Sequence, residues 1–241
     1  MNYINQAITW LNDPLNWTNP GGIIDSLKQH LWLSFLSVLV ATFIALPIGV
    51  WFGHSGRGGS TVVAVSNMTR AIPTYALLAV FVVGTAKLGA PSVVPALAIF
   101  AIPPILANAY TGIREVDPEV RDSARGMGLS GGQMLRQVEL PLASPYIWAG
   151  LRNAAVQVVA TATLAALVAG GGLGTIITAG FGLSIAAGGG QIIAGGFLVA
   201  LLALLVNGVI SVFAYFLTPI PLRGTTRRRL FRQRARVVTD R

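Results

Sequence analysis

Residues 31–53 read LWLSFLSVLVATFIALPIGVWFG and contain no charged side chain. A helix of about 22 residues rises roughly 33 Å, enough to cross a membrane hydrocarbon core of about 30 Å. Further apolar stretches occupy residues 62–86, 91–112, 147–169 and 192–217. Arg70 and Pro73 interrupt the second stretch, and Pro103-Pro104 interrupts the third. The pattern predicts an all-α polytopic membrane protein with about five transmembrane helices.

The composition excludes a soluble enzyme. Of the 241 residues 54% are hydrophobic and 10% are charged, and the mean hydropathy is +0.68, whereas an ordinary soluble domain is about 25% charged. The chain has no cysteine, which excludes disulfides and thiolate metal sites. Its two histidines, His30 and His54, are too few for a histidine-rich metal centre.

The net charge of +9 is concentrated at the C-terminus, because eight of the seventeen basic residues lie between Arg223 and Arg241. A basic cluster directly after an apolar span is typical of a cytoplasmic anchor, so we expect no nucleic-acid partner. A second hypothesis is that this tail senses ionic strength close to anionic lipid.

The positive-inside rule also orients the chain. It places the loops 54–61 and 113–146 and the C-terminal tail in the cytoplasm, because most Arg residues lie there. The N-terminus is then outside, and we expect it to be retained, since the first 27 residues contain Asp13 and Asp25 but no Lys or Arg. The predicted division is an external segment 1–30, a transmembrane domain 31–217 containing the cytoplasmic loop 113–146, and a cytoplasmic tail 218–241.

The cytoplasmic loop 113–146, IREVDPEVRDSARGMGLSGGQMLRQVELPLASPY, holds five of the eight acidic residues. Asp117-Pro118-Glu119 is typical of a helix start, with an N-cap acid, a proline at the first helical position and an acid in the first turn. We predict a short helix that extends to about Met127. Val120, Ala124 and Met127 are spaced to give it one apolar face, and Gly126 and Gly128 permit a sharp turn after it.

A second loop helix is predicted to follow. Ser130 and Gln133 fit a capping box, Pro141 is expected to end this helix, and Ser144-Pro145 to begin the fourth span. A solvated helical hairpin without a partner is an alternative interpretation of the loop.

The spacing within the loop resembles a known family. Asp122-Ser123-Ala124, Gly128 and the ending Val138-Glu139-Leu140-Pro141 resemble the EAA loop of ABC importer permeases, with Asp, Ser and Val in place of the usual Glu, Ala and Ile. The resemblance implies the type I importer permease fold and a loop that docks on an ATPase subunit. By this resemblance the candidate coupling residues are Asp117, Glu119, Val120, Asp122, Ser123, Ala124, Met127, Gly128, Leu140 and Pro141.

The flanking sequence is similar to the osmoprotectant branch of these permeases. The similar segments are PILANAYTGI at 104–113, ATLAA at 162–166, GGGLG at 170–174 and AIP at 71–73. They imply uptake of glycine betaine, choline, carnitine or proline betaine. Alternatives are an importer for amino acids such as methionine or another small polar solute, and a stand-alone secondary transporter. The latter is disfavoured because no acidic residue lies within a predicted span.

The chain holds no ATP-binding motif of its own. A P-loop ends in Gly-Lys-Ser/Thr, but Lys28 and Lys87, the only lysines, are followed by Gln and Leu. The family resemblance therefore implies two separate ATPase subunits that bind ATP and Mg²⁺, a second permease that is identical or paralogous, and a separate extracellular substrate-binding protein. We expect the chain to be a multi-pass protein of the bacterial cell membrane, with no catalytic residue, cofactor or metal site.

Polar and helix-interrupting residues within the spans are candidates for the translocation pathway: Asn67, Arg70, Pro73, Tyr75, Asn108 and Tyr110. Each has a simpler structural interpretation. Arg70 can extend its side chain to the membrane surface, Asn108 can form an interhelical hydrogen bond, and the tyrosines can serve packing alone. Ala162, Ala166 and Gly170 predict a close helix contact in the fourth span, either along the axis of a permease dimer or within the subunit. Residues 175–190 are expected to form an external segment.

Overall fold

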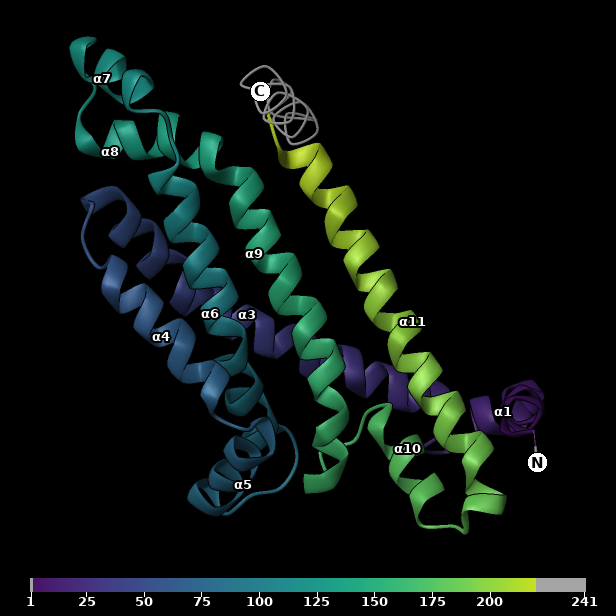
Figure 1. The fold of residues 1–241 in the computed structure, drawn as a ribbon. Helices are drawn as coiled ribbons and strands as arrows, with labels where there is room; N and C mark the ends of the chain where they lie inside the picture. The colour runs from purple at the N-terminus through teal and green to yellow at the C-terminus, as the bar shows by residue number, and fades with distance from the viewer. Residues whose placement is uncertain (1, 220–241) are drawn as a thin grey trace, which may run out of the picture.

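The computed structural model describes residues 2–219, without the side chains of residues 68–70, and its regular elements there are all helical (Figure 1). Apart from Thr218 and Pro219, the predicted cytoplasmic tail lies outside the described residues. The helices are α1 (Tyr3–Asn12), α2 (Pro14–Thr18), α3 (Ile23–Ser55), α4 (Gly59–Ala71), α5 (Thr74–Thr85), α6 (Ala90–Arg114), α7 (Pro118–Gly126), α8 (Gly131–Gln133), a π-helical segment (Met134–Glu139), α9 (Leu140–Thr161), a 3₁₀ segment (Ala162–Val168), α10 (Gly174–Phe181) and α11 (Ile185–Leu217).

Four helical stretches in the described residues are long and apolar enough to cross a membrane, namely 14–55, 90–114, 131–168 and 185–217. They correspond to four of the five predicted spans, and the all-α membrane class is confirmed. The second predicted span is divided into α4 and α5 at Ile72-Pro73. Ile72 adopts an extended conformation (φ −89°, ψ 122°), as expected for a residue before proline, where steric clash disfavours the helical region.

The central contact joins α3 and α6. Small residues at three- or four-residue intervals form the buried stripe of α3: Ser34, Ser37, Ala41, Ala45, Gly49 and Gly53. At Gly49 an added Cβ would lie 2.7 Å from the carbonyl oxygen of Leu106 on α6. The two backbones therefore approach as closely as they do only because these side chains are small.

Helix α9 packs against another side of α6. Gly150 of α9 lies against Asn108, and Gly112 of α6 lies against Tyr146. This packing makes α6 the centre of the bundle, between α3 and α9. It also positions Asn108 where two helices meet.

The prediction that Pro141 ends the second loop helix was wrong. The chain remains helical from Gly131 to Val168, and Pro141 and Pro145 both lie inside this stretch. A proline ring normally collides with the carbonyl four residues earlier. Here the wider π-helical turn, Met134–Glu139, comes directly before Leu140-Pro141 and makes room for the ring.

The end of the same long helix tightens into the 3₁₀ segment, which buries Ala162, Ala165 and Val168. A 3₁₀ helix has three residues per turn, so its buried face recurs at every third residue. Within the subunit the buried face is therefore not the predicted stripe of Ala162, Ala166 and Gly170, although Gly170 does lie close to Val93 of α6.

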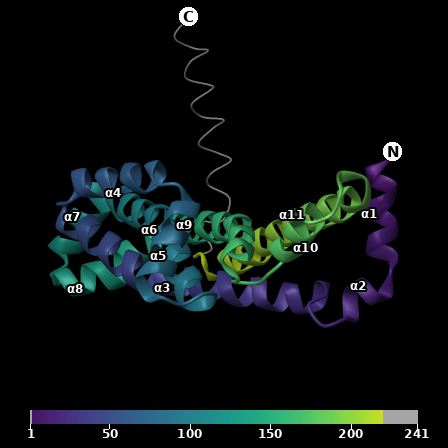
Figure 2. The same ribbon diagram turned by 90° about the horizontal axis from the view of Figure 1, so that it is seen from below.

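The two ends of the molecule carry different elements. Figure 1 places α7, α8 and the C-terminal end of α11 at one end, and α5, α10 and the start of α11 at the other. Seen from below, α1 and α2 form the end furthest from α7 and α8 (Figure 2). Within the external segment predicted for 175–190, Gly188–Gly190 are helical and buried in the first turns of α11, where Gly189 lies against Tyr3 of α1.

Candidate functional site

The predicted helix start in the loop is confirmed. The Oδ1 atom of Asp117 accepts a hydrogen bond from the backbone N–H of Glu119 at 2.9 Å, and Pro118 occupies the first turn of α7. The helix ends at Gly126, and Gly128 adopts φ +84°, a left-handed conformation that glycine adopts without strain. A sharp turn then leads into α8.

The predicted capping box is also confirmed. The backbone N–H of Ser130 donates to Oε1 of Gln133 at 2.8 Å, and the N–H of Gln133 donates to the Ser130 hydroxyl at 3.5 Å. We call residues 117–133 the coupling hairpin, after the role that the family resemblance predicts for the loop. Its two helices begin with local side-chain caps, so the sequence within the hairpin suffices to define where they start.

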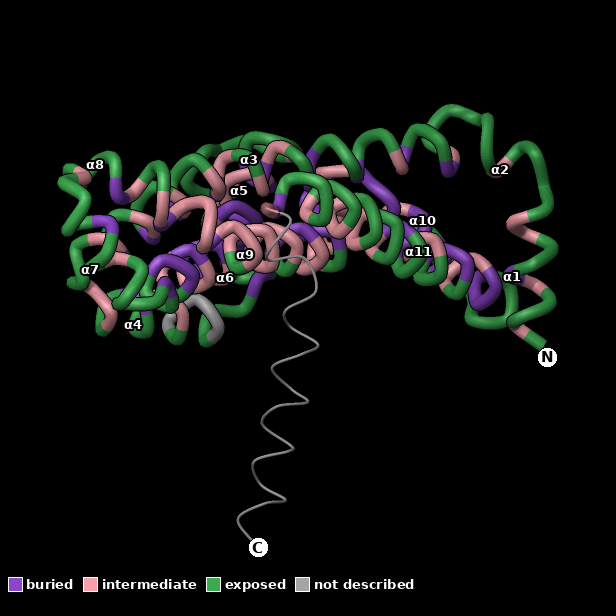
Figure 3. The backbone as a smooth tube through the Cα atoms, turned by 90° about the horizontal axis from the view of Figure 1, so that it is seen from above, coloured by how far each residue is buried: buried purple, intermediate pink, exposed green. Residues whose placement is uncertain are grey.

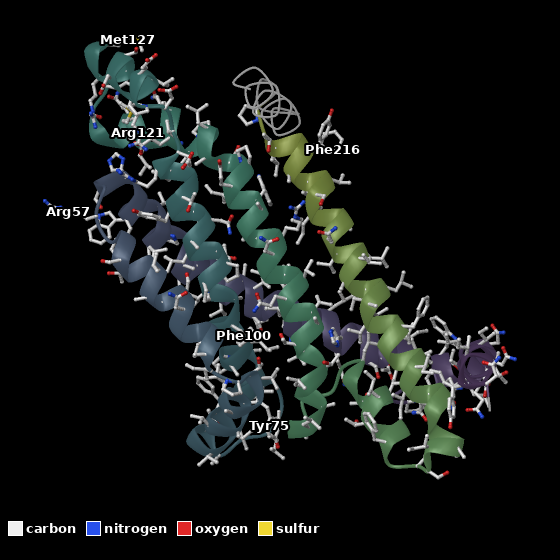
Figure 4. The ribbon with its side chains drawn as sticks, in the orientation of Figure 1. Arg57, Tyr75, Phe100, Arg121, Met127 and Phe216 are labelled. Atoms are coloured by element: carbon white, nitrogen blue, oxygen red, sulfur yellow. The ribbon has the colours of Figure 1, made fainter. Side chains whose placement is uncertain are left out.

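The outer surface of the coupling hairpin is largely exposed (Figure 3). Met127 lies at its tip, at the far side of the hairpin from the helical bundle (Figure 4), and is 75% exposed. Val120 is exposed as well, whereas Ala124 is only 2% exposed. The three residues therefore do not form the single apolar face that their spacing predicted: Ala124 packs inward, and Val120 and Met127 remain accessible.

A buried carboxylate lies where the coupling hairpin meets the bundle. The Glu139 side chain is 3% exposed, and its Oε2 lies 2.5 Å from Nδ1 of His54 at the end of α3. Its Oε1 lies 3.3 Å from Nε of Arg121 on α7, although the Arg121 N–H is not aligned to donate a hydrogen bond to it. Arg121 also donates through Nη2 to the carbonyl of Ile113 in α6.

None of these three residues is among the functional candidates that the sequence predicts. Two signals were present: Glu139 is a lone acid in the apolar run Val138-Glu139-Leu140-Pro141, and His54 directly follows an uncharged span. Neither signal indicates that the two side chains meet, because 85 residues separate them.

A cavity of about 440 Å³ opens between α4, α6 and α9. Such a volume is within the range of small-molecule sites. Its lining residues are Val62, Val63, Ser66, Asn67, Phe100, Pro103, Pro104, Ala107, Asn108, Tyr110, Thr111, Asn153 and Gln157. Four of them are carboxamides, and none is charged.

Three of the six pathway candidates, Asn67, Asn108 and Tyr110, line this cavity together. Asn108 donates to the carbonyl of Pro104 at 2.7 Å, a bond within α6 rather than between helices. A Cβ on Gly59, at the start of α4, would lie only 2.6 Å from the Tyr110 hydroxyl. Because glycine has no side chain, the hydroxyl fits there. The Ser66 hydroxyl is buried without a hydrogen-bond partner in the described structure.

The remaining pathway candidates do not line the cavity as described. Pro73 is the N-cap of α5, and Tyr75 is exposed at the opposite end of the bundle from Met127 (Figure 4). The side chain of Arg70 lies outside the described residues. Arg152, a charged residue in α9 that is not among the predicted candidates, lines a separate cleft of about 190 Å³ between α9 and α11.

The fold and the loop define a class of protein. Residues 45–217 match the family of binding-protein-dependent transport system inner membrane components, and the chain belongs to this family. It is therefore a membrane-embedded transport component, and the family resemblance seen in its loop is confirmed.

Three named relatives are similar to this chain over most of its length. The chain is 34% identical to the glycine betaine/carnitine/choline transport system permease protein OpuCB of Bacillus subtilis, over 92% of this chain and 98% of the relative. It is 35% identical to the choline transport system permease protein OpuBB of the same organism, over 84% of this chain and 91% of the relative. The osmoprotectant import permease protein OsmW of Salmonella typhimurium is 30% identical over 85% of this chain and 96% of the relative.

Solved structures show the same fold. An inward-facing structure of the MetNI methionine ABC transporter superposes with a TM-score of 0.72 at 22% identity, covering 86% of this chain and all of the matched chain. An amino acid ABC transporter crystallised with histidines gives a TM-score of 0.67 at 19% identity, covering 88% and 97% of the two chains.

Proposed function

We propose that this permease imports quaternary-ammonium compatible solutes, namely glycine betaine, choline, carnitine and proline betaine, by ATP-driven transport. The observation that carries the proposal is the 34–35% identity, over most of the chain, to permeases named for three of these solutes. The alternative solutes, methionine and other amino acids, appear in the names of the two structural neighbours, which are 22% and 19% identical to this chain.

We propose that the cavity between α4, α6 and α9 is this permease's half of the translocation pathway. Its amides and the rings of Phe100 and Tyr110 can solvate a zwitterion or cation without a fixed counter-charge. A lining without a carboxylate binds such a solute weakly, as a translocation pathway requires, because tight binding would slow the release of the solute. We assign the selective, high-affinity site to a separate extracellular binding protein.

ATP binding and hydrolysis take place on two partner ATPase subunits in this proposal, so the permease has no catalytic residue or cofactor of its own. A second permease, identical or paralogous, completes the pathway. The coupling hairpin docks on the ATPase through its exposed residues Val120 and Met127, with Asp117, Glu119 and Asp122 beside them. Leu140 and Pro141 lie at the base of the hairpin, where α9 begins.

The docking proposal is tested by Met127→Glu. Because Met127 is 75% exposed, the substitution spares the bundle and places a charge on the apolar contact. We expect the tagged variant, purified gently from its native membranes, to carry at least tenfold less bound ATPase than the native permease does. A loss of about 1.4 kcal/mol in binding free energy gives this change.

The matched control is Ile185→Glu, which makes the same kind of charge change at a residue that is 74% exposed at the other end of the molecule. It should retain the ATPase in full. Equal ATPase recovery from Met127→Glu and the native chain would contradict docking through the hairpin tip. The absence of any ATPase from native preparations, with solute uptake intact in liposomes, would favour a stand-alone transporter instead.

A further inference from the structure

Glu139 connects helices that are far apart in the sequence. It is the last residue of the π-helical segment, and its two carboxylate oxygens contact His54 at the end of α3 and Arg121 on α7. Arg121 in turn donates to the carbonyl of Ile113, near the end of α6. One buried carboxylate therefore joins α7 and the π-helical segment to the ends of two membrane helices.

The surroundings of this cluster are tightly packed. The Arg121 side chain is 13% exposed, and Nε2 of His54 lies 3.7 Å from the Cβ position of Gly131, at the start of α8. His54 therefore lies close to the start of α8 and in contact with Glu139. The Arg121–Glu139 ion pair, shielded from water in this way, is screened little by salt.

The hairpin also contains an ion pair that lacks these properties. Arg125 and Asp122 lie on the same helix α7, again 3.3 Å apart, but both side chains are mostly exposed. An exposed pair of neighbouring residues on one helix cannot connect that helix to another element. Among the ion pairs of the described residues, those of Glu139 with Arg121 and His54 connect the hairpin region to the bundle.

We infer that Glu139, with Arg121 and His54, is the positioning cluster that makes the coupling hairpin move as one body with the ends of α3 and α6. The inference rests on the proposed docking of the hairpin on the ATPase. A movement of α7 imposed by ATPase closure then reaches α3 through Glu139 and His54, and α6 through the Arg121–Ile113 bond. The π-helical segment holds Glu139 in register for both contacts.

The first test is Glu139→Gln in the complete transporter, reconstituted with its ATPase and binding protein in liposomes. The amide has the same shape as the carboxylate but no charge. We expect the complex to assemble and to hydrolyse ATP. The amount of solute imported per ATP hydrolysed should fall about fivefold to tenfold, a change of the size that coupling between two sites commonly has. Arg121→Gln should reduce the ratio similarly, and the double variant should lose no more than either single variant.

Arg136→Gln is the matched control, since Arg136 is an exposed charge on the same π-helical segment, and it should leave the ratio unchanged. An unchanged ratio in an assembled Glu139→Gln complex would overturn the inference but leave the proposed function intact. Loss of the ATPase from the native complex would instead refute the proposed function.

A second measurement does not depend on transport activity. The chain has no cysteine, so spin labels can be attached specifically at Ser55→Cys, the exposed last residue of α3, and at Gly132→Cys, where the added side chain meets open space. We expect one narrow distance between them in both the nucleotide-free and ATP-bound states, and a broadened or shifted distance after Glu139→Gln. The same distribution in both backgrounds, or a shift with nucleotide in the native background, would overturn the inference.

Discussion

Two arginines on α7 show how burial changes the contribution of an ion pair to stability. Arg121 and Arg125 each lie 3.3 Å from a carboxylate oxygen, but Arg121 is 13% exposed and Arg125 is 68% exposed. An exposed ion pair contributes 0–1 kcal/mol because water screens it. Removing one partner of a buried pair costs more, because the other charge is left without compensation.

We therefore predict that Arg121→Ala lowers the free energy of unfolding by about 3 kcal/mol, and that Arg125→Ala lowers it by less than about 1 kcal/mol. Thermal unfolding of the purified permease in detergent, followed by tryptophan fluorescence, compares the two variants under the same conditions. Equal midpoints for both would show that the burial of Glu139 does not matter to stability.

The close approach of α3 and α6 gives a second residue-level prediction. Gly49→Ala places a Cβ 2.7 Å from the carbonyl oxygen of Leu106, and such overpacking costs about 1–3 kcal/mol. The identical substitution at Gly208 on α11 meets open space and should be neutral or stabilising, by up to about 1 kcal/mol. The same unfolding assay checks both variants, and a stable Gly49→Ala would contradict the tight contact.

At the scale of elements, the sequence predicted those features that depend on neighbouring residues. The caps at Asp117 and Ser130, the turn at Gly128 and the break at Pro73 all follow from interactions within four residues. Pro141 was misjudged, because its effect depends on a π-helical turn that no local propensity indicates. The meeting of His54 and Glu139 was not predictable, since it depends on how distant helices pack.

The capping box provides a prediction at this scale. Ser130→Ala removes the acceptor for the Gln133 N–H, which should cost about 1 kcal/mol at the start of the helix. We expect faster hydrogen exchange in residues 131–136 and unchanged exchange in the middle of α9, because the lost bond is local. Unchanged exchange in residues 131–136 would show that the tertiary contacts of Met134 and Glu139 hold this helix start without its cap.

At the scale of the whole molecule, the charge pattern predicts an external N-terminus and a cytoplasmic hairpin. The absence of cysteine makes this testable with single cysteines at Asn12 and Gly132, both exposed. A membrane-impermeant maleimide should label Asn12→Cys in intact cells, and Gly132→Cys only after permeabilisation. The reverse pattern would contradict the orientation.

The apolar spans and the hairpin were enough to predict the fold class and the family, because hydropathy and the EAA-type spacing are properties of the sequence alone. The residues that line the cavity proposed for translocation were only partly predicted. Asn153 and Gln157 of α9 line it beside Asn67 and Asn108, but nothing in the sequence shows which face of α9 lies toward α4 and α6.

The most direct test of the proposed function is uptake by the reconstituted transporter. Liposomes containing the permease, its ATPase and its binding protein are given radiolabelled glycine betaine, choline, carnitine or methionine, with ATP or without it. We predict ATP-dependent accumulation of one or more of the three quaternary ammonium solutes and none of methionine. Accumulation of methionine alone, or accumulation that needs no ATP, would contradict the proposed function.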